Sequence, residues 1–137
     1  MAATIETTFD QYLPMSAEET YALLCDWDDH ARWVPLTRVA THSPDEFTAY
    51  TGLGPLALPD RMRVVRRDDA SLSVTVEKLG PVLRGTAGFV VRPFDASSCV
   101  VRWHESVRVP LIPGRLSRVL SGMARVLFRA ALRRLPR

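Results

Sequence analysis

Residues 25–35, with the sequence CDWDDHARWVP, concentrate side chains of the types that bind metals or move protons: Asp26, Asp28, Asp29 and His30. A metal site needs ligands that converge on one point, whereas consecutive side chains on a helix diverge by about 100°. Aspartates also hydrogen-bond to nearby backbone and favour caps and turns. We therefore predict a turn and a second short helix that Pro35 ends, and no metal site.

Two tryptophans, Trp27 and Trp33, lie in the same segment. Large aromatic side chains of this kind close the end of a hydrophobic core. At the mouth of a cavity they would equally contact a ligand, and the residues alone leave both interpretations open.

Glu105 is the other candidate for chemistry. In an expected strand over residues 99–109, alternation places Val101, Trp103, Glu105 and Val107 on one face, which we take as the inward one. Burial raises the pKa of a carboxyl group, so Glu105 is a candidate general base or hydrogen-bond anchor for a ligand hydroxyl. The simpler alternative is a structural ion pair with an arginine or with Lys78, and we weigh it above both functional roles.

The elements that must position these residues begin with an alternating strand at Thr4–Leu13, which Pro14 ends. Ser16 and Glu19 form a capping box that opens a helix through AEETYALLCD. Six further strands, separated by turn clusters, are expected at residues 38–42, 46–51, 61–67, 72–78, 84–94 and 99–109. Their short connections predict an antiparallel meander.

The segment TGLGPLALP, residues 51–59, contains a Gly-x-Gly pair. It has no third glycine, no following Lys-Ser or Lys-Thr and no helix after it, so we predict a plain loop rather than a phosphate cradle.

A long amphipathic helix is expected over residues 113–135. Apolar residues recur there at three- and four-residue spacing, and arginines occupy the opposite face; the apolar set is Leu116, Val119, Leu120, Met123, Val126, Leu127, Ala130 and Ala131. We expect this apolar face to be buried.

Composition limits the classes of function. The chain has 137 residues, 47% of them hydrophobic, which suits one domain with a real core. It shows no export leader and no run of about 18 apolar residues, so we expect a cytoplasmic protein.

Cys25 and Cys99 lie far apart and are expected to be reduced thiols. Residues 113–137 hold seven arginines and no acidic residue, so the net charge of +3 becomes −4 over residues 1–112. Basicity confined to one helix with a single aromatic residue does not favour nucleic-acid binding.

The order strand, two short helices, six strands and a long helix predicts an α+β fold (β-α-α-β6-α). A curved antiparallel sheet of about seven strands would wrap around the C-terminal helix. A hollow between sheet and helix is expected, and such hollows hold small molecules.

Several segments, read in order, resemble the START-like (SRPBCC) helix-grip superfamily, and in particular its polyketide cyclase/dehydrase-like branch, common in high-GC bacteria. They are CDWDDHARWVP, TGLGPLALPDRMRV, LRGTAGFVVRP and VRWHESVRVPLIPGRL, followed by the terminal helix. The resemblance implies a deep apolar cavity between the sheet and the C-terminal helix. Aromatase/cyclase members are thought to use interior arginine, tyrosine and serine residues, whereas the inward positions here look mostly apolar. That departure weakens the cyclase interpretation.

The expected cavity wall combines alternate strand residues with the apolar helix face, although each could equally be plain core. We predict ligand contacts from Trp33, Phe47, Ala49, Met62, Val64, Val74, Val76, Phe89, Trp103, Glu105, Leu120, Met123 and Leu127.

Three functions follow from this site. The first is binding of a hydrophobic small molecule such as a lipid, polyketide or isoprenoid, without a cofactor, metal or nucleic acid. The second is a polyketide cyclase or dehydratase with Glu105 as the base. The third is a lipid shuttle whose arginine-rich helix face meets anionic headgroups, against which a merely solvated face is the simpler interpretation. We expect a monomer or weak homodimer.

Overall fold

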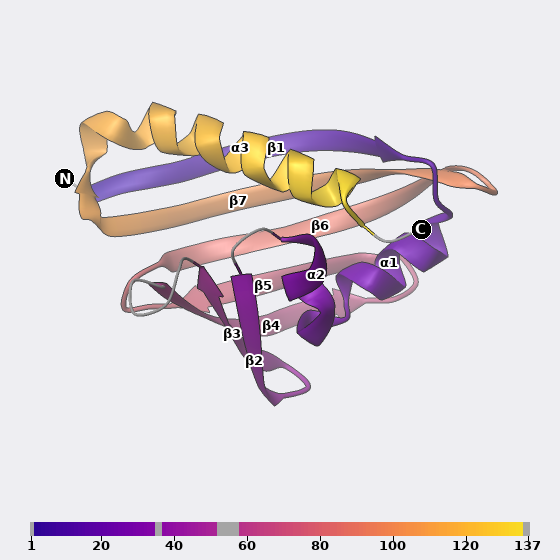
Figure 1. The fold of residues 1–137 in the computed structure, drawn as a ribbon, viewed down its shortest axis with the longest axis horizontal. Coiled ribbons are helices and arrows are strands. Elements are labelled where there is room, and N and C mark those ends of the chain that lie inside the picture. Colours follow the sequence, from indigo (N-terminus) through magenta and orange to yellow (C-terminus); the bar gives the residue numbers. More distant parts are fainter. Residues whose placement is uncertain (1, 35–36, 52–57, 136–137) are drawn as a thin grey trace.

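The computed structural model describes residues 2–34, 37–51 and 58–135. Within them, seven strands form one antiparallel sheet in the order β1-β7-β6-β5-β4-β3-β2 (Figure 1). The strands are β1 (Ala2–Leu13), β2 (Thr37–Ser43), β3 (Glu46–Thr51), β4 (Leu58–Asp68), β5 (Ser73–Leu79), β6 (Arg84–Asp95) and β7 (Ser98–Pro113). The predicted α+β helix-grip fold is confirmed, and β2 to β7 run as the expected meander.

The first helix, α1 (Ala17–Leu24), begins at the predicted cap. The backbone N–H of Glu19 donates to the Ser16 hydroxyl at 3.2 Å, which satisfies one of the free amides at the start of the helix. Ala17, Tyr21 and Leu24 are buried. The capping box therefore orients α1 so that one face joins the core.

The acidic and aromatic segment after α1 forms the predicted turn and short helix, as a 3-10 turn (Trp27–Asp29) followed by α2 (His30–Trp33). Two of its polar side chains tie the segment to its neighbours, whereas Asp26 at the start of the 3-10 turn makes no capping hydrogen bond. The Nε2–H of His30 donates to the carbonyl of Leu24 at 2.8 Å, where α1 ends, and Asp28 accepts a hydrogen bond from the hydroxyl of Thr41. Among the described residues, no group of three His, Cys, Asp or Glu side chains is arranged to hold a metal.

The long C-terminal helix, α3 (Ser117–Arg133), lies along β1 at one edge of the sheet (Figure 1). It follows a 3-10 turn (Gly114–Leu116), because β7 continues to Pro113 and takes up the first residue of the predicted helix. In the described part of the chain, no helix is both long enough and apolar enough to cross a bilayer.

The prediction of which α3 face is buried was wrong for most of its large side chains. Ala131 of the predicted face is buried, together with Ala124 and Leu132, and Phe128 packs against the core. Most large apolar residues of the predicted face are exposed: Leu116, Val119, Met123, Val126 and Leu127. The helix is rotated away from the orientation that would bury the most apolar surface.

Hydrogen bonds to the edge strand explain this rotation. The backbone N–H groups of Thr4 and Glu6 each donate to an α3 serine at 3.0 Å, and two α3 arginines donate to the carbonyls of Thr8 and Asp10 at 2.9 and 3.2 Å. The four helix residues involved lie four apart: Ser117, Ser121, Arg125 and Arg129. Because β1 is an edge strand, these side chains satisfy backbone groups that no neighbouring strand pairs.

The predicted loop over residues 51–59 is only partly described. Thr51 ends β3 and Leu58 begins β4, while residues 52–57 lie outside the described residues.

Candidate functional site

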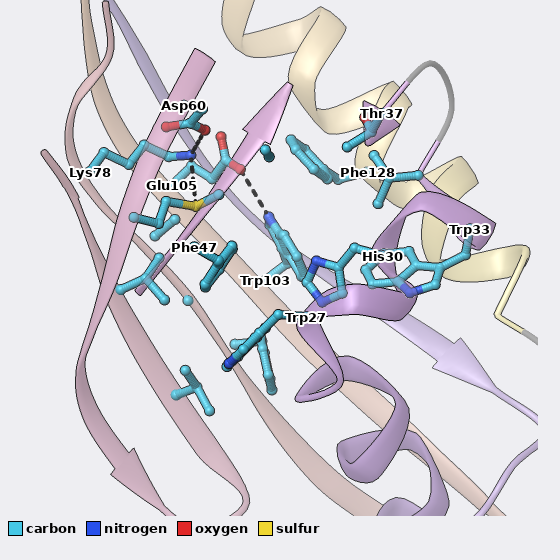
Figure 2. Close-up of a pocket in the computed structure, with 18 residues that line it drawn as sticks. Trp27, His30, Trp33, Thr37, Phe47, Asp60, Lys78, Trp103, Glu105 and Phe128 are labelled. Carbon is cyan, nitrogen blue, oxygen red and sulfur yellow. Dashed lines mark hydrogen bonds and ion pairs between the residues drawn. The ribbon is translucent and has the colours of Figure 1, made fainter. Parts of the chain in front are cut away.

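A cavity lies between the curved sheet, α2 and α3 (Figure 2). It offers about 100 Å³ to the centres of water-sized molecules, whereas a single water needs about 10–15 Å³ on this scale. The hollow is therefore open, although aromatic side chains fill much of the space between sheet and helix.

Most residues predicted as wall do line this cavity. They are Trp33, Phe47, Ala49, Met62, Val74, Val76, Phe89, Trp103 and Glu105. Strand alternation placed those on strands correctly on the inner face, because inward residues of β5 and β7 recur at every second position, whereas Trp33 lies on α2. Whether they contact a ligand remains a prediction.

Four predicted residues do not line the cavity. Val64 packs against the core outside it, and Leu120 is half-buried on α3. Met123 and Leu127 are exposed, because the hydrogen bonds to β1 turn their side of the helix outward. The predicted contacts from α3 were therefore wrong, and Phe128 lines the cavity instead.

The remaining residues that line the cavity were not among the predicted ligand contacts. They are Trp27, His30, Val34, Thr37, Asp60, Lys78, Ala87, Gly88 and Phe128. Asp60 was detectable in principle, because it shares strand parity with the predicted Met62. Lys78 likewise shares parity with Val74 and Val76, and it is the only lysine in the chain.

Three strands bring Asp60 (β4), Lys78 (β5) and Glu105 (β7) to the polar end of the cavity (Figure 2). The Lys78 ammonium contacts Asp60 Oδ2 at 2.5 Å and also lies 3.6 Å from the Met62 sulfur. The indole N–H of Trp103 donates to Glu105 Oε1 at 3.3 Å. We call Asp60, Lys78 and Glu105 the polar cluster. All three are buried.

The polar cluster holds two carboxyl groups and one ammonium group, and one of its buried carboxylate oxygens has no partner among the described residues. Asp60 Oδ1 is buried and has no hydrogen-bond partner among the described residues. An unpaired buried acceptor of this kind costs about 1–3 kcal/mol in lost hydration. The cavity therefore presents an acceptor that a bound hydroxyl or amine would satisfy.

Burial raises the pKa of Glu105, and the pKa stays raised although the charge of Lys78 and the indole hydrogen bond of Trp103 act to lower it. A neutral Glu105 can donate its proton to a ligand oxygen, and an ionised one can accept a hydroxyl proton. The group is thus placed to anchor an oxygen-bearing ligand or to transfer a proton.

Flat aromatic rings form the other walls. Trp103 stacks on Phe128 with ring centroids 5.1 Å apart and on Phe89 at 5.9 Å, while Trp27 stacks on Phe47 at 4.9 Å. Walls of this type favour planar apolar groups.

The pKa of Glu105 gives a pH dependence that can be tested. Since its pKa in the folded chain lies above the ordinary value of 4.5, the folded state holds the proton to higher pH than the unfolded state. The contribution of Glu105 to stability therefore falls as pH rises above 4.5. As pH increases above this value, we expect the free energy of unfolding of Glu105→Gln to increase relative to that of the native chain. Urea unfolding of both proteins at several pH values measures this difference. A relative loss over the same range would contradict a raised pKa.

No protein-family model and no curated protein sequence matches this chain. Solved structures do match. The di-domain ARO/CYC BexL from the BE-7585A biosynthetic pathway is 20% identical with a TM-score of 0.74, covering 95% of this chain and 45% of that one. A START superfamily protein from Mycobacterium smegmatis is 14% identical with a TM-score of 0.74, and the match covers 94% of this chain and 93% of that one. The Zhui aromatase/cyclase from Streptomyces sp. R1128 is 12% identical with a TM-score of 0.70, and the match covers 94% of this chain and 91% of that one. This chain therefore spans less than half of the di-domain protein and nearly all of the other two.

Proposed function

Given that this chain has the START-like helix-grip fold, we propose that it binds a planar, mostly apolar small molecule that carries a hydroxyl group at one end. The apolar ring would lie against the aromatic wall that contains Trp103 and Phe128, and the hydroxyl would contact the polar cluster.

The unpaired Asp60 Oδ1 is the observation that carries this proposal. An interior that served only as core would gain stability, or lose none, if apolar residues replaced both Asp60 and Lys78. Retaining a carboxylate whose second oxygen has no partner among the described residues leaves a cost of about 1–3 kcal/mol, which a ligand hydroxyl removes by donating to it.

The cavity size supports a small ligand. Pockets for drug-sized molecules are typically about 300–1,000 Å³, and an apolar cavity of about 150 Å³ holds one benzene ring. The volume of about 100 Å³ therefore favours a molecule with a single ring over a polycyclic molecule or a long-chain lipid.

A matched pair of probes tests the proposal. We expect phenol to bind about tenfold more tightly than benzene, because one good hydrogen bond to a charged group is worth at least about 1.4 kcal/mol. The measurement is an NMR titration of the labelled protein. Asp60→Leu with Lys78→Met removes the carboxylate acceptor together with its cation, at similar side-chain volume, and should bring the two affinities together. Equal affinities for the native chain, or shifts confined to surface residues, would refute the proposal.

A second candidate is proton-transfer catalysis by Glu105, favoured by its raised pKa inside an apolar cavity. In the dehydration that follows ring closure, an ionised Glu105 would take a proton from the carbon beside a carbonyl. The C–O bond of the β-hydroxyl would break as a C=C bond forms, and the proton would go to the departing oxygen, so that water leaves. Glu105→Gln should then abolish conversion of a polyketide-like substrate while binding persists. Unchanged turnover would exclude Glu105 as the base.

A further inference from the structure

The outward side of α3 carries a continuous row of large apolar side chains. Their exposed fractions are 40% for Leu116, 57% for Val119, 62% for Met123, 70% for Val126 and 36% for Leu127. Residues three and four positions apart share one face of a helix, so these side chains lie together. We call them the outer stripe. Isolated exposed apolar residues are ordinary, but a row along a helix marks an interaction surface.

Arginines border the outer stripe. At about 100° per residue, Arg118 and Arg133 project on the flank between the side facing β1 and the outer stripe, beside Arg125 and Arg129, which bond to β1. Arg115 and Arg134 lie at the two ends of the helix and are exposed. From residue 113 to the C-terminus the sequence contains no aspartate or glutamate. The apolar row therefore runs beside a band of purely positive charge.

We propose that α3 docks on an anionic lipid surface, with the outer stripe inserted among the acyl chains and the arginines placed at the headgroups. A helix with a strongly apolar side, an arginine-rich flank and no acidic residue has the features of helices that lie in the plane of a membrane interface. The arginine charge supplies attraction to anionic headgroups, and the stripe supplies insertion.

The charge argues against a second copy of this chain as the occupant. Two outer stripes packed on each other would bring two arginine bands close together, and the helix offers no acidic side chain to compensate them. Like charges across an interface cost affinity.

The shape argues against an acidic partner helix. A partner helix commonly lays its apolar side into a hydrophobic groove. Here α3 lies as a ridge at the border of the molecule, beside the edge strand β1 (Figure 1). A ridge with exposed apolar side chains suits insertion into a soft lipid surface.

The hydrogen bonds between α3 and β1 give the docking surface a fixed orientation. Ser117, Ser121, Arg125 and Arg129 hold one side of the helix on the strand, so the outer stripe faces outward in the free protein. No unfolding or ligand is required, and the docking surface is thus independent of the small-molecule site.

Sedimentation with lipid vesicles tests the proposal. The native chain should sediment with vesicles of phosphatidylcholine mixed with phosphatidylglycerol, and not with phosphatidylcholine alone, and rising salt should weaken the binding. The double variant Val126→Ser with Met123→Ser keeps every charge and should bind about tenfold more weakly, because it removes inserted apolar area. Val65→Ser, at a half-exposed apolar position on β4, is the matched control and should bind as the native chain does.

Circular dichroism melting shows whether each variant is folded, and Arg118→Gln provides a second readout through a smaller salt dependence. Equal binding by the double variant and the native chain would overturn the proposal, since arginines alone would then suffice. Absence of binding to the mixed vesicles would overturn it as well. A native dimer in solution that the double variant converts to monomer would assign the outer stripe to a second copy instead.

Discussion

Lys78→Ala should lower the free energy of unfolding by about 3–5 kcal/mol, the range found when one partner of a buried ion pair is removed. Lys78 is the cation that faces Asp60 at 2.5 Å, and its charge also favours ionisation of Glu105. Without it, two carboxyl groups share a buried space with no opposite charge. The chain would have to protonate one of them or admit water to the cavity.

A neighbouring ion pair provides a control for this measurement. Arg63 and Glu77 face each other across the same two strands, 3.2 Å apart, with half of each side chain exposed. Arg63→Ala should therefore cost about 1 kcal/mol or less. Urea unfolding of both variants at neutral pH gives the comparison. Equal losses would mean that the polar cluster is solvated and that Asp60 is not an unpaired acceptor in the cavity.

The loss caused by Lys78→Ala should also depend on pH. In the variant, Glu105 loses the nearby charge that lowers its pKa, so its protonated form becomes more favoured in the folded state. Folding then takes up protons, and the stability deficit should shrink as pH falls toward 4 or below, where carboxyl groups are neutral also in the unfolded chain. A deficit that stays constant across this range would indicate lost packing of the lysine stem rather than lost charge.

The strands and their inward faces could be predicted because burial in a sheet follows a simple period of two. Alternation alone placed Trp103 and Glu105 on the inner side of β7, and local capping rules alone located the start of α1 at Ser16. These signals are local, so one sequence is enough to read them.

The polar cluster could be predicted only in part. Glu105 was found from its parity, and Lys78 was considered as its partner. Asp60 instead takes the ammonium of Lys78 in the closest contact, and this pairing depends on how β4 and β5 align. Strand register across a connection of several residues is a tertiary property that composition and spacing do not determine.

The orientation of α3 could not be predicted for a related reason. Helical periodicity identifies an apolar side, and the usual inference is that this side is buried. In this fold, unpaired backbone groups of β1 form hydrogen bonds with the serine and arginine side of the helix. This holds that side, rather than the large apolar side, against the sheet. Small residues such as Ala124 and Ala131 then allow close approach to the core. The prediction failed where hydrogen bonding to an edge strand outweighed burial of large side chains.

Two alanine substitutions on α3 test this orientation directly. Leu132 is fully buried, so Leu132→Ala should lower the free energy of unfolding by about 2–5 kcal/mol through lost burial and the cavity left behind. Met123 is 62% exposed, so Met123→Ala should change stability by no more than about 0.5 kcal/mol. Both substitutions place the same strong helix former in the same helix, so intrinsic helix propensity contributes little to the difference.

Urea unfolding of the two variants decides between the orientations. A large loss at Leu132 with none at Met123 would place the outer stripe in solvent, where a lipid surface can reach it. The reverse order would mean that α3 turns its large apolar side inward in solution. Met123 and Leu127 would then return to the cavity wall, and the arginines would be left without the apolar row that membrane insertion requires.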